Sequence, residues 1–136
     1  MPQTITQKVL LKGTTPDVVY TMYLTPKHHT ALTGSTHADI SAKQGTSFEL
    51  WDGYITGKNL QLVKDRLIVQ AWRGSDWNDN DADSTFMLLL EKKDDDVLIH
   101  MTHANIPDEF VKDIKKGWTT HYWKPWQKYL DLYKGK

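Results

Sequence analysis

The chain has 136 residues with 17 basic and 17 acidic side chains, so its formal net charge is zero. Without a basic excess, the attraction that drives non-specific binding to nucleic acids or anionic membranes is missing. The absence of cysteine excludes disulfides and thiolate chemistry, and neither a signal peptide nor an apolar run that could span a bilayer is present. We therefore expect one cytoplasmic domain over residues 1–136.

The first third of the chain predicts a strand followed by two short helices. Apolar residues alternate with polar ones over residues 4–12, as in a half-buried strand. Thr15 and Thr25 each stand directly before a proline, which is the usual order of a helix cap and the first helical residue. Gly34 is expected to end the second helix. The pattern therefore predicts a helix pair over residues 15–33.

From Ala38 to Ala104 the chain is rich in β-branched and aromatic residues, and much of it alternates with period two. Glycines and acidic clusters separate these segments, which predict five or six antiparallel strands. Residues 92–97 predict a tight turn, and residues 75–84 predict a longer hairpin loop. The acidic loop lacks the glycine and glutamate that an EF-hand requires, so we interpret it as a solvated loop and not as a calcium site.

Residues after Pro107 predict a long terminal helix, capped by Asn105 and running to about Tyr133. On a wheel of roughly 100° per residue, one apolar stripe contains Ile114, Trp118, Tyr122, Pro125, Tyr129 and Leu132. We expect this stripe to face the sheet. Pro125 lies within it and removes a backbone donor, which predicts a kink at His121–Tyr122.

Two tryptophans of this helix, Trp123 and Trp126, fall outside the stripe. They are either covered by the helix pair or a loop, or exposed to a partner. Because an exposed tryptophan is a typical interface anchor, we name both as candidates for a surface that binds a partner protein. The order of elements is strand, helix pair, run of strands and long helix. That order predicts an α+β domain in which an antiparallel sheet is covered on one face.

Four segments carry a resemblance to a known family. They are "FELWDGYITGKNLQLV" (48–63), "IVQAWRGSDW" (68–77), "HANIP" (103–107) and "GWTTHYWKPWQKYL" (117–130). In this order the sequence resembles the activator of Hsp 90 ATPase homologue (AHSA-type) family, within the START-like (SRPBCC) superfamily. The resemblance covers nearly the whole chain. It implies a helix-grip fold, in which a curved antiparallel sheet of about six or seven strands wraps around a long C-terminal helix, with a short helix pair after the first strand.

The resemblance implies two different functions. Members of the superfamily often enclose an apolar cavity between sheet and helix, which implies a module that binds a small apolar or amphipathic ligand. The alternative is a co-chaperone-like interaction domain that regulates the ATPase of an Hsp 90-type chaperone. We favour the first interpretation. Ligand pockets are lined mainly by apolar and aromatic residues, and the candidates here are Trp51, Tyr54, Trp72, Met87, Met101, Trp118, His121, Tyr122 and Tyr129.

The sequence contains no nucleophile elbow, phosphate-binding loop, dinucleotide motif or zinc-protease motif, so we expect no enzymatic activity and no cofactor. No metal site is expected either, because His100 and His103 on a strand would face opposite sides of the sheet. His28 and His29 are expected to be solvated. Arg73 closes a strand, where an ion pair with Asp76 or Asp79 is the favoured interpretation over an anion site.

Overall fold

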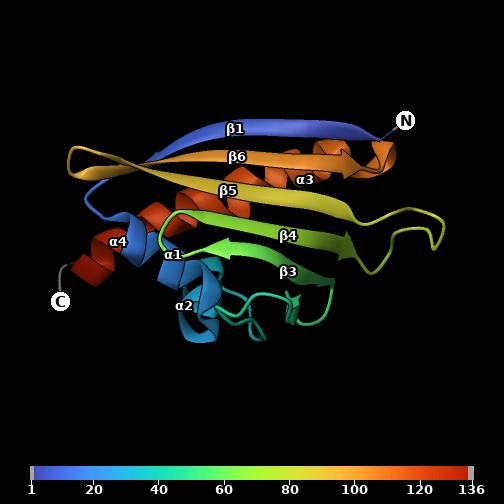
Figure 1. Cartoon of the computed structure of the whole chain (residues 1–136), viewed down its shortest axis with the longest axis horizontal. Helices are drawn as coiled ribbons and strands as arrows, with labels where there is room; N and C mark the ends of the chain where they lie inside the picture. The colour runs from blue at the N-terminus through green and yellow to red at the C-terminus, as the bar shows by residue number, and fades with distance from the viewer. Residues whose placement is uncertain (1, 135–136) are drawn as a thin grey trace.

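The computed structural model describes residues 2–134, and its central feature is a six-stranded antiparallel sheet in the order β1-β6-β5-β4-β3-β2 (Figure 1). The strands are β1 (Gln3–Leu11), β2 (Ser47–Leu50), β3 (Ile55–Val63), β4 (Leu67–Gly74), β5 (Ser84–Lys93) and β6 (Asp96–Ile106). Two short helices, α1 (Pro16–Leu24) and α2 (Pro26–Thr33), follow β1 along the chain. The predicted α+β helix-grip arrangement is confirmed.

The local signals at the loops and at the short helices are confirmed. Thr15 and Thr25 are the N-caps of α1 and α2, and Gly34 ends α2 in the left-handed conformation at φ 77°. Residues 75–83 connect β4 to β5, and a tight turn connects β5 to β6, as predicted. Asn105 is not a helix cap: it lies in β6 with φ 61°, and its side-chain amide donates to the Asp83 carbonyl.

The sheet is amphipathic because alternate residues of its central strands point to opposite faces. In β5 the side chains of Phe86 and Leu88 are buried, whereas those of Met87 and Leu89 are exposed. The ring of Phe86 stacks on Trp118 of the terminal helix with 4.5 Å between centroids. The helix therefore covers the inner face of the sheet, and the opposite face is left to solvent.

The terminal helix is built from η1 (Asp108–Phe110), α3 (Val111–Gly117), η2 (Trp118–Trp123) and α4 (Lys124–Lys134). The η2 segment is π-helical, and the Lys124 N–H donates to the Thr119 carbonyl five residues earlier. This wide turn stands directly before Pro125, whose nitrogen has no proton to donate. The sequence predicts a kink at this point; the structure has a π-helical segment there, and the kink itself stays a prediction.

The π-helical segment corrects the predicted orientation of the helix. A π turn holds about one residue more than an α turn, so it rotates all later side chains by roughly 100°. The buried residues after the segment are Trp126 and Leu130, each one position beyond the predicted Pro125 and Tyr129. Leu132, which the wheel placed against the sheet, is 65% exposed.

The prediction that Trp123 and Trp126 form a partner surface is therefore wrong. Trp123 is 6% exposed and Trp126 is fully buried. The indole N–H of Trp123 donates to the Gln7 side chain of β1 at 2.6 Å, while the ring of Trp126 stacks on Tyr23 of α1 at 6.1 Å. Both tryptophans belong to the core.

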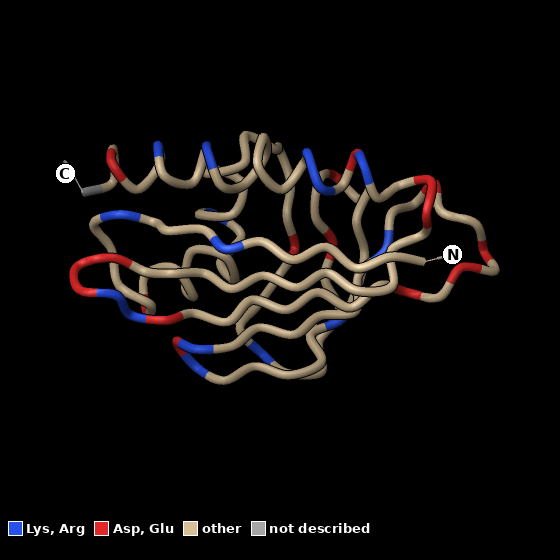
Figure 2. Tube along the Cα trace, turned by 90° about the horizontal axis from the view of Figure 1, so that it is seen from above, with Lys and Arg blue, Asp and Glu red and all other residues tan. Residues whose placement is uncertain are grey.

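Charged residues lie mainly on the solvent side of the terminal helix and in the loops that join the strands (Figure 2). None of the helices in the described part of the chain is both long and apolar enough to cross a membrane.

Candidate functional site

A cavity of about 450 Å³ lies between the terminal helix and one end of the sheet. Its lining consists of Trp51, Tyr54, Ile55, Trp72, Asp76, Phe110, Asp113, Ile114, Gly117, Trp118, His121 and Tyr122. The side chains of Ile55, Trp72, Trp118 and Tyr122 are buried and form the floor. Those of Tyr54, Asp76, Asp113 and His121 are exposed and mark the mouth.

The turn between β2 and β3 positions one wall of the cavity. Trp51, Asp52 and Gly53 all have positive φ angles, of 56°, 58° and 92°. This conformation is uncommon for residues with a β-carbon and is found preferentially at functional sites. It places the Trp51 ring 5.2 Å from His121 and 6.1 Å from Tyr122, centroid to centroid. The turn therefore connects the sheet edge to the π-helical segment across the cavity.

A chain of hydrogen bonds runs from this wall into the core. The Tyr122 hydroxyl accepts from the Trp51 indole N–H at 3.1 Å and lies 2.9 Å from Nε2 of His29. His29 Nδ1 lies 2.7 Å from the Tyr23 carbonyl, which can only accept, so Nδ1 carries the ring proton. Nε2 must then accept from the Tyr122 hydroxyl. Each group in this chain therefore donates to the next, from Trp51 to Tyr122, then to His29 and finally to the Tyr23 carbonyl.

His29 is therefore a neutral structural residue. It is 1% exposed, and burial lowers the pKa of its ring to about 4, although the hydrogen bond to the Tyr23 backbone opposes that shift. The prediction that His29 is solvated is wrong. Its neighbour His28 is half-buried, and its Nδ1 lies 2.7 Å from the Tyr129 hydroxyl.

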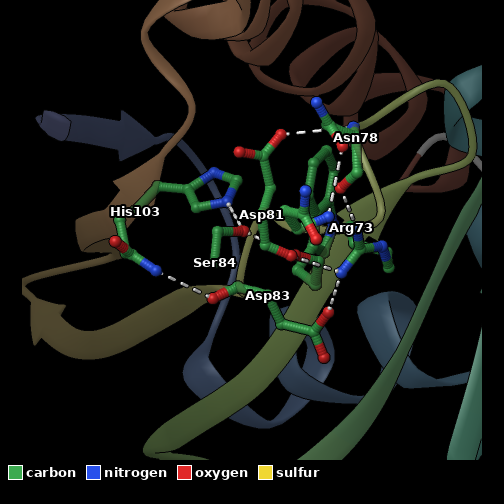
Figure 3. Close-up of polar contacts among 9 residues, drawn as sticks. Arg73, Asn78, Asp81, Asp83, Ser84 and His103 are labelled. Carbon is green, nitrogen blue, oxygen red and sulfur yellow. Dashed lines mark hydrogen bonds and ion pairs between the residues drawn. The ribbon is translucent and has the colours of Figure 1, made fainter. Parts of the chain in front are cut away.

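A second buried histidine, His103, lies beneath the cavity floor. Its Nδ1 accepts from the Trp118 indole N–H at 3.1 Å. Its Nε2 lies 2.7 Å from the Ser84 hydroxyl, as Figure 3 shows. Ser84 in turn donates to the Trp72 carbonyl at 2.6 Å. Because Nδ1 is the acceptor in the neutral ring, Nε2 carries the proton and cannot take one from Ser84. The pair resembles a catalytic dyad but has the wrong tautomer for a base.

Burial lowers the pKa of His103 to about 3, which keeps the ring neutral. His100 points to the other face of the sheet and lies 2.9 Å from Glu91, so the predicted separation of the two histidines is confirmed.

At the cavity floor, the indole N–H of Trp72 is buried without a hydrogen-bond partner among the described residues. A buried donor of this kind calls for an explanation, because such groups are normally paired.

The loop after β4 is held by Arg73. Its guanidinium forms an ion pair with Asp83 at 2.7 Å and donates to the carbonyls of Asn78 and Asp81 (Figure 3). The predicted partners Asp76 and Asp79 are therefore wrong. The reason is geometric, since Asp83 lies just before β5 and so beside the strand that carries Arg73.

This arrangement leaves Asp76 free to face the cavity. The Tyr54 hydroxyl donates to Asp76 Oδ1 at 2.7 Å. The next residue, Trp77, is buried and stacks on Phe110 with 5.7 Å between ring centroids. The loop is thus anchored to the start of the terminal helix, where it forms the rim of the cavity.

Six of the nine predicted cavity residues line this one cavity: Trp51, Tyr54, Trp72, Trp118, His121 and Tyr122. Three do not. Met87 is wrong because the alternation of β5 turns its side chain to the outer face, where it is 37% exposed. Met101 is buried in the core, outside the lining, and Tyr129 is rotated away by the π-helical segment.

The prediction missed several lining residues, among them Asp76, Phe110 and Asp113. Asp76 and Asp113 look like solvated charges in the sequence, and nothing in the local pattern shows that both face one space. Ile114 and Gly117 had a usable signal, since they lie on the same helix face as Trp118 and His121. Among the described residues, no group of histidine or carboxylate side chains is arranged to hold a metal ion.

Comparisons with known proteins agree with this architecture. Residues 13–131 match the family model described as "Activator of Hsp90 ATPase homolog 1-like protein". The human protein named "Activator of 90 kDa heat shock protein ATPase homolog 1" is 27% identical over 122 residues, which is 88% of this chain. Those residues are 36% of the human protein, so the chain spans about a third of that relative's length.

Solved structures show the same fold. The crystal structure of an HSP90 activator from Plasmodium falciparum has a TM-score of 0.79 at 25% identity, covering 88% of this chain and 90% of that one. The solution structure of the Aha1 dimer from Colwellia psychrerythraea has a TM-score of 0.74 at 13% identity, covering 87% and 89%. Because the family model matches most of the length of this chain, the chain belongs to the family of Activator of Hsp90 ATPase homolog 1-like proteins.

Proposed function

We propose that this protein is a non-enzymatic START-like module that binds a small amphipathic ligand in the cavity between its sheet and its terminal helix. The observation that carries the proposal is the cavity itself. Its volume of about 450 Å³ and its aromatic lining fit the usual range of small-molecule sites.

The polar groups around the cavity favour binding over catalysis. His29 and His103 are neutral, and both ring nitrogens of each are engaged. Burial raises the pKa of the Tyr122 hydroxyl far above its usual value, so it stays protonated as a donor to His29. Neither of the two buried histidines, nor the Tyr122 hydroxyl, is therefore poised to exchange a proton with a molecule in the cavity.

Ligand binding can be tested by thermal unfolding with a library of small aromatic and aliphatic compounds. A ligand at 100 times its dissociation constant stabilises the native state by about 2.7 kcal/mol. For a chain of this size that corresponds to a rise in Tm of roughly 9 °C. The variant Ile114→Trp places a larger side chain in the lining and should abolish the shift, because the new ring occupies the ligand's space.

The matched control is Met87→Trp, which adds the same kind of side chain to the exposed outer face of β5. This variant should keep the full ligand-induced shift. The proposal is wrong if no compound in a chemically diverse library raises Tm, or if Ile114→Trp responds as the wild type does.

A second candidate function rests on the comparisons. The human and Plasmodium relatives are named as activators of the 90-kDa heat-shock protein ATPase or of HSP90. We propose on that basis that the chain can bind an Hsp90-type chaperone. Because Trp123 and Trp126 are buried, the contact surface must be sought elsewhere.

The outer face of the sheet is the better candidate for this contact. Val63, Leu67 and Leu89 lie side by side across β3, β4 and β5, and Val69 lies next to Met87 in the adjoining row. Val63, Met87 and Leu89 are 40%, 37% and 37% exposed. A patch of this kind marks interaction surfaces on soluble domains.

Calorimetry with a purified Hsp90-type chaperone, with and without ATP, tests this second function. The variant Leu89→Asp should weaken binding, whereas Leu132→Asp, an equally polar change at an exposed site on the terminal helix, should not. Absence of binding under both nucleotide conditions would exclude the interaction and leave the ligand proposal untouched.

A further inference from the structure

The charges at the mouth of the cavity are of one sign. Asp76 from the β4–β5 loop and Asp113 from α3 both line it, and none of its lining residues is lysine or arginine. The whole chain carries equal numbers of acidic and basic residues, so this bias is local.

The helix α3 shows the bias most directly. Its sequence VKDIKKG contains three lysines and one aspartate. Asp113, Ile114 and Gly117 line the cavity, whereas the three lysines are exposed and lie outside the lining. Residues at these spacings share one side of an α-helix, so α3 presents its single carboxylate to the cavity and its positive charges to solvent.

The nearest arginine does not offset the two carboxylates. Arg73 is held in its ion pair with Asp83, outside the lining. Besides the two carboxylates, the lining contains two other ionisable side chains, Tyr54 and His121. Burial, the hydrogen bond to Asp76 and the charges of Asp76 and Asp113 raise the pKa of Tyr54 to about 12, so its hydroxyl stays neutral.

Asp76 and Asp113 line the same cavity as Tyr54. The Tyr54 hydroxyl fixes the Asp76 carboxylate at the mouth by a hydrogen bond of 2.7 Å. Trp51, Trp118 and Tyr122 line the same cavity, and the half-buried Trp51 is the most exposed of the three rings. Aromatic rings attract cations through their quadrupole, and a nearby carboxylate adds to that attraction.

We propose that the cavity selects an organic cation, an amine or quaternary ammonium on an apolar body, over neutral and anionic molecules of the same shape. This inference rests on the proposed ligand-binding function. The apolar body occupies the aromatic floor. The positive charge lies at the mouth between Asp76 and Asp113, where it remains partly hydrated.

Three probes with one naphthyl body test the selection. They are (1-naphthylmethyl)trimethylammonium, its neutral carbon isostere 1-neopentylnaphthalene, and the anion 1-naphthylacetate. Dissociation constants are measured by calorimetry at low salt and at about 0.5 M salt, where screening is strong. We expect the cation to bind at least about tenfold tighter than the neutral isostere at low salt, and the anion to bind most weakly. The preference for the cation should shrink at high salt because exposed charges are screened.

Charge-neutral variants identify the source of the selection. Asp113→Asn and Asp76→Asn should each weaken cation binding by roughly three- to tenfold and leave the neutral isostere unchanged. In the Asp76→Asn variant the new amide oxygen can still accept from Tyr54, so the rim keeps its geometry. Matched controls are Asp79→Asn in the same loop and Asp131→Asn on α4, each of which removes a carboxylate outside the lining. Neither control should change the dissociation constant of any probe by more than about twofold.

The outcomes separate the two proposals. If the neutral isostere binds as tightly as the cation, or if the cation preference survives in the Asp76→Asn/Asp113→Asn double variant, the charge selection is wrong while ligand binding stands. If none of the probes binds and the broad library also gives no shift in Tm, the ligand-binding function fails. A preference that is lost in the double variant and kept in both controls supports the inference.

Discussion

Removal of the Tyr122 hydroxyl, in a Tyr122→Phe variant, would leave two neighbours of that oxygen without a partner. The His29 Nε2 acceptor loses its donor, and the Trp51 N–H loses its acceptor. The aromatic contacts of the ring are kept, including the one to Trp118 at 4.6 Å between centroids. The variant therefore isolates the hydrogen bonds from the packing.

The magnitude follows from burial. His29 is 1% exposed, so water cannot reach its unpaired nitrogen without local opening. An unsatisfied buried polar group costs about 1–3 kcal/mol, and the half-buried Trp51 adds less because its N–H lies nearer to solvent. We expect the free energy of unfolding to fall by about 2 kcal/mol, which lowers Tm by roughly 7 °C in a chain of this size.

Urea unfolding followed by circular dichroism measures this loss without relying on tryptophan fluorescence. Tyr133→Phe is the control, since Tyr133 is 46% exposed on the last turns of the same helix. In the double variant Tyr122→Phe/His29→Leu the two losses should fall short of additivity by at least about 1 kcal/mol, because one hydrogen bond is removed twice. A Tyr122→Phe variant within about 0.5 kcal/mol of wild type would refute the hydrogen-bond chain, because an unpaired buried group costs at least about 1 kcal/mol.

Three further predictions concern stability. Burial lowers the pKa values of His29 and His103 to about 4 and 3, so the unfolded chain binds protons first as the pH falls. The free energy of unfolding measured in urea should therefore fall by roughly 3–4 kcal/mol between pH 7 and pH 5 because of these two groups. A free energy of unfolding that does not change over this pH range would contradict their buried neutral state. Gly117→Ala should raise the free energy of unfolding by about 0.5–1 kcal/mol, because Gly117 is helical and an added Cβ meets only His121, at 3.6 Å. A lower free energy of unfolding in this variant would show that the backbone there is not helical. Gly57→Ala should lower it by roughly 3 kcal/mol, because the new Cβ would lie 1.9 Å from the Ala71 carbonyl oxygen, and a neutral thermal melt would contradict that approach.

The strands and turns were predictable because their signals are local. Alternation of apolar residues sets which face of β4, β5 and β6 is buried, and the acidic turn and loop stand where the chain reverses. Proline and glycine likewise mark the ends of α1 and α2. None of these features depends on a distant part of the chain.

The orientation of the terminal helix was not predictable by the same means. A wheel assumes one constant rotation per residue, and the π-helical segment Trp118–Trp123 breaks that assumption in mid-helix. The wheel is correct up to Tyr122 and displaced by one residue beyond it. As a result the wheel assigns Trp126, which is fully buried, to the surface.

The polar half of the site also depends on distant contacts. His29 is separated from Tyr122 by 93 residues, and Asp76 and Asp113 come from different elements. A histidine in a short helix and an aspartate in a loop both look solvated in the sequence. Trp72, Trp118 and Tyr122 were easier to predict, since a large ring on an inner strand position or on the first helical stripe is expected to meet the core.

The central claim, that the cavity binds a small organic molecule, is tested most directly by the six tryptophan indole N–H resonances in a proton–nitrogen NMR spectrum. Trp51, Trp72 and Trp118 line the cavity, while Trp123 and Trp126 do not. Titration with (1-naphthylmethyl)trimethylammonium should shift the first three resonances most. Shifts that are largest at Trp123 and Trp126 would contradict the claim, and so would the absence of any indole shift both with this probe and with every compound of the broad library.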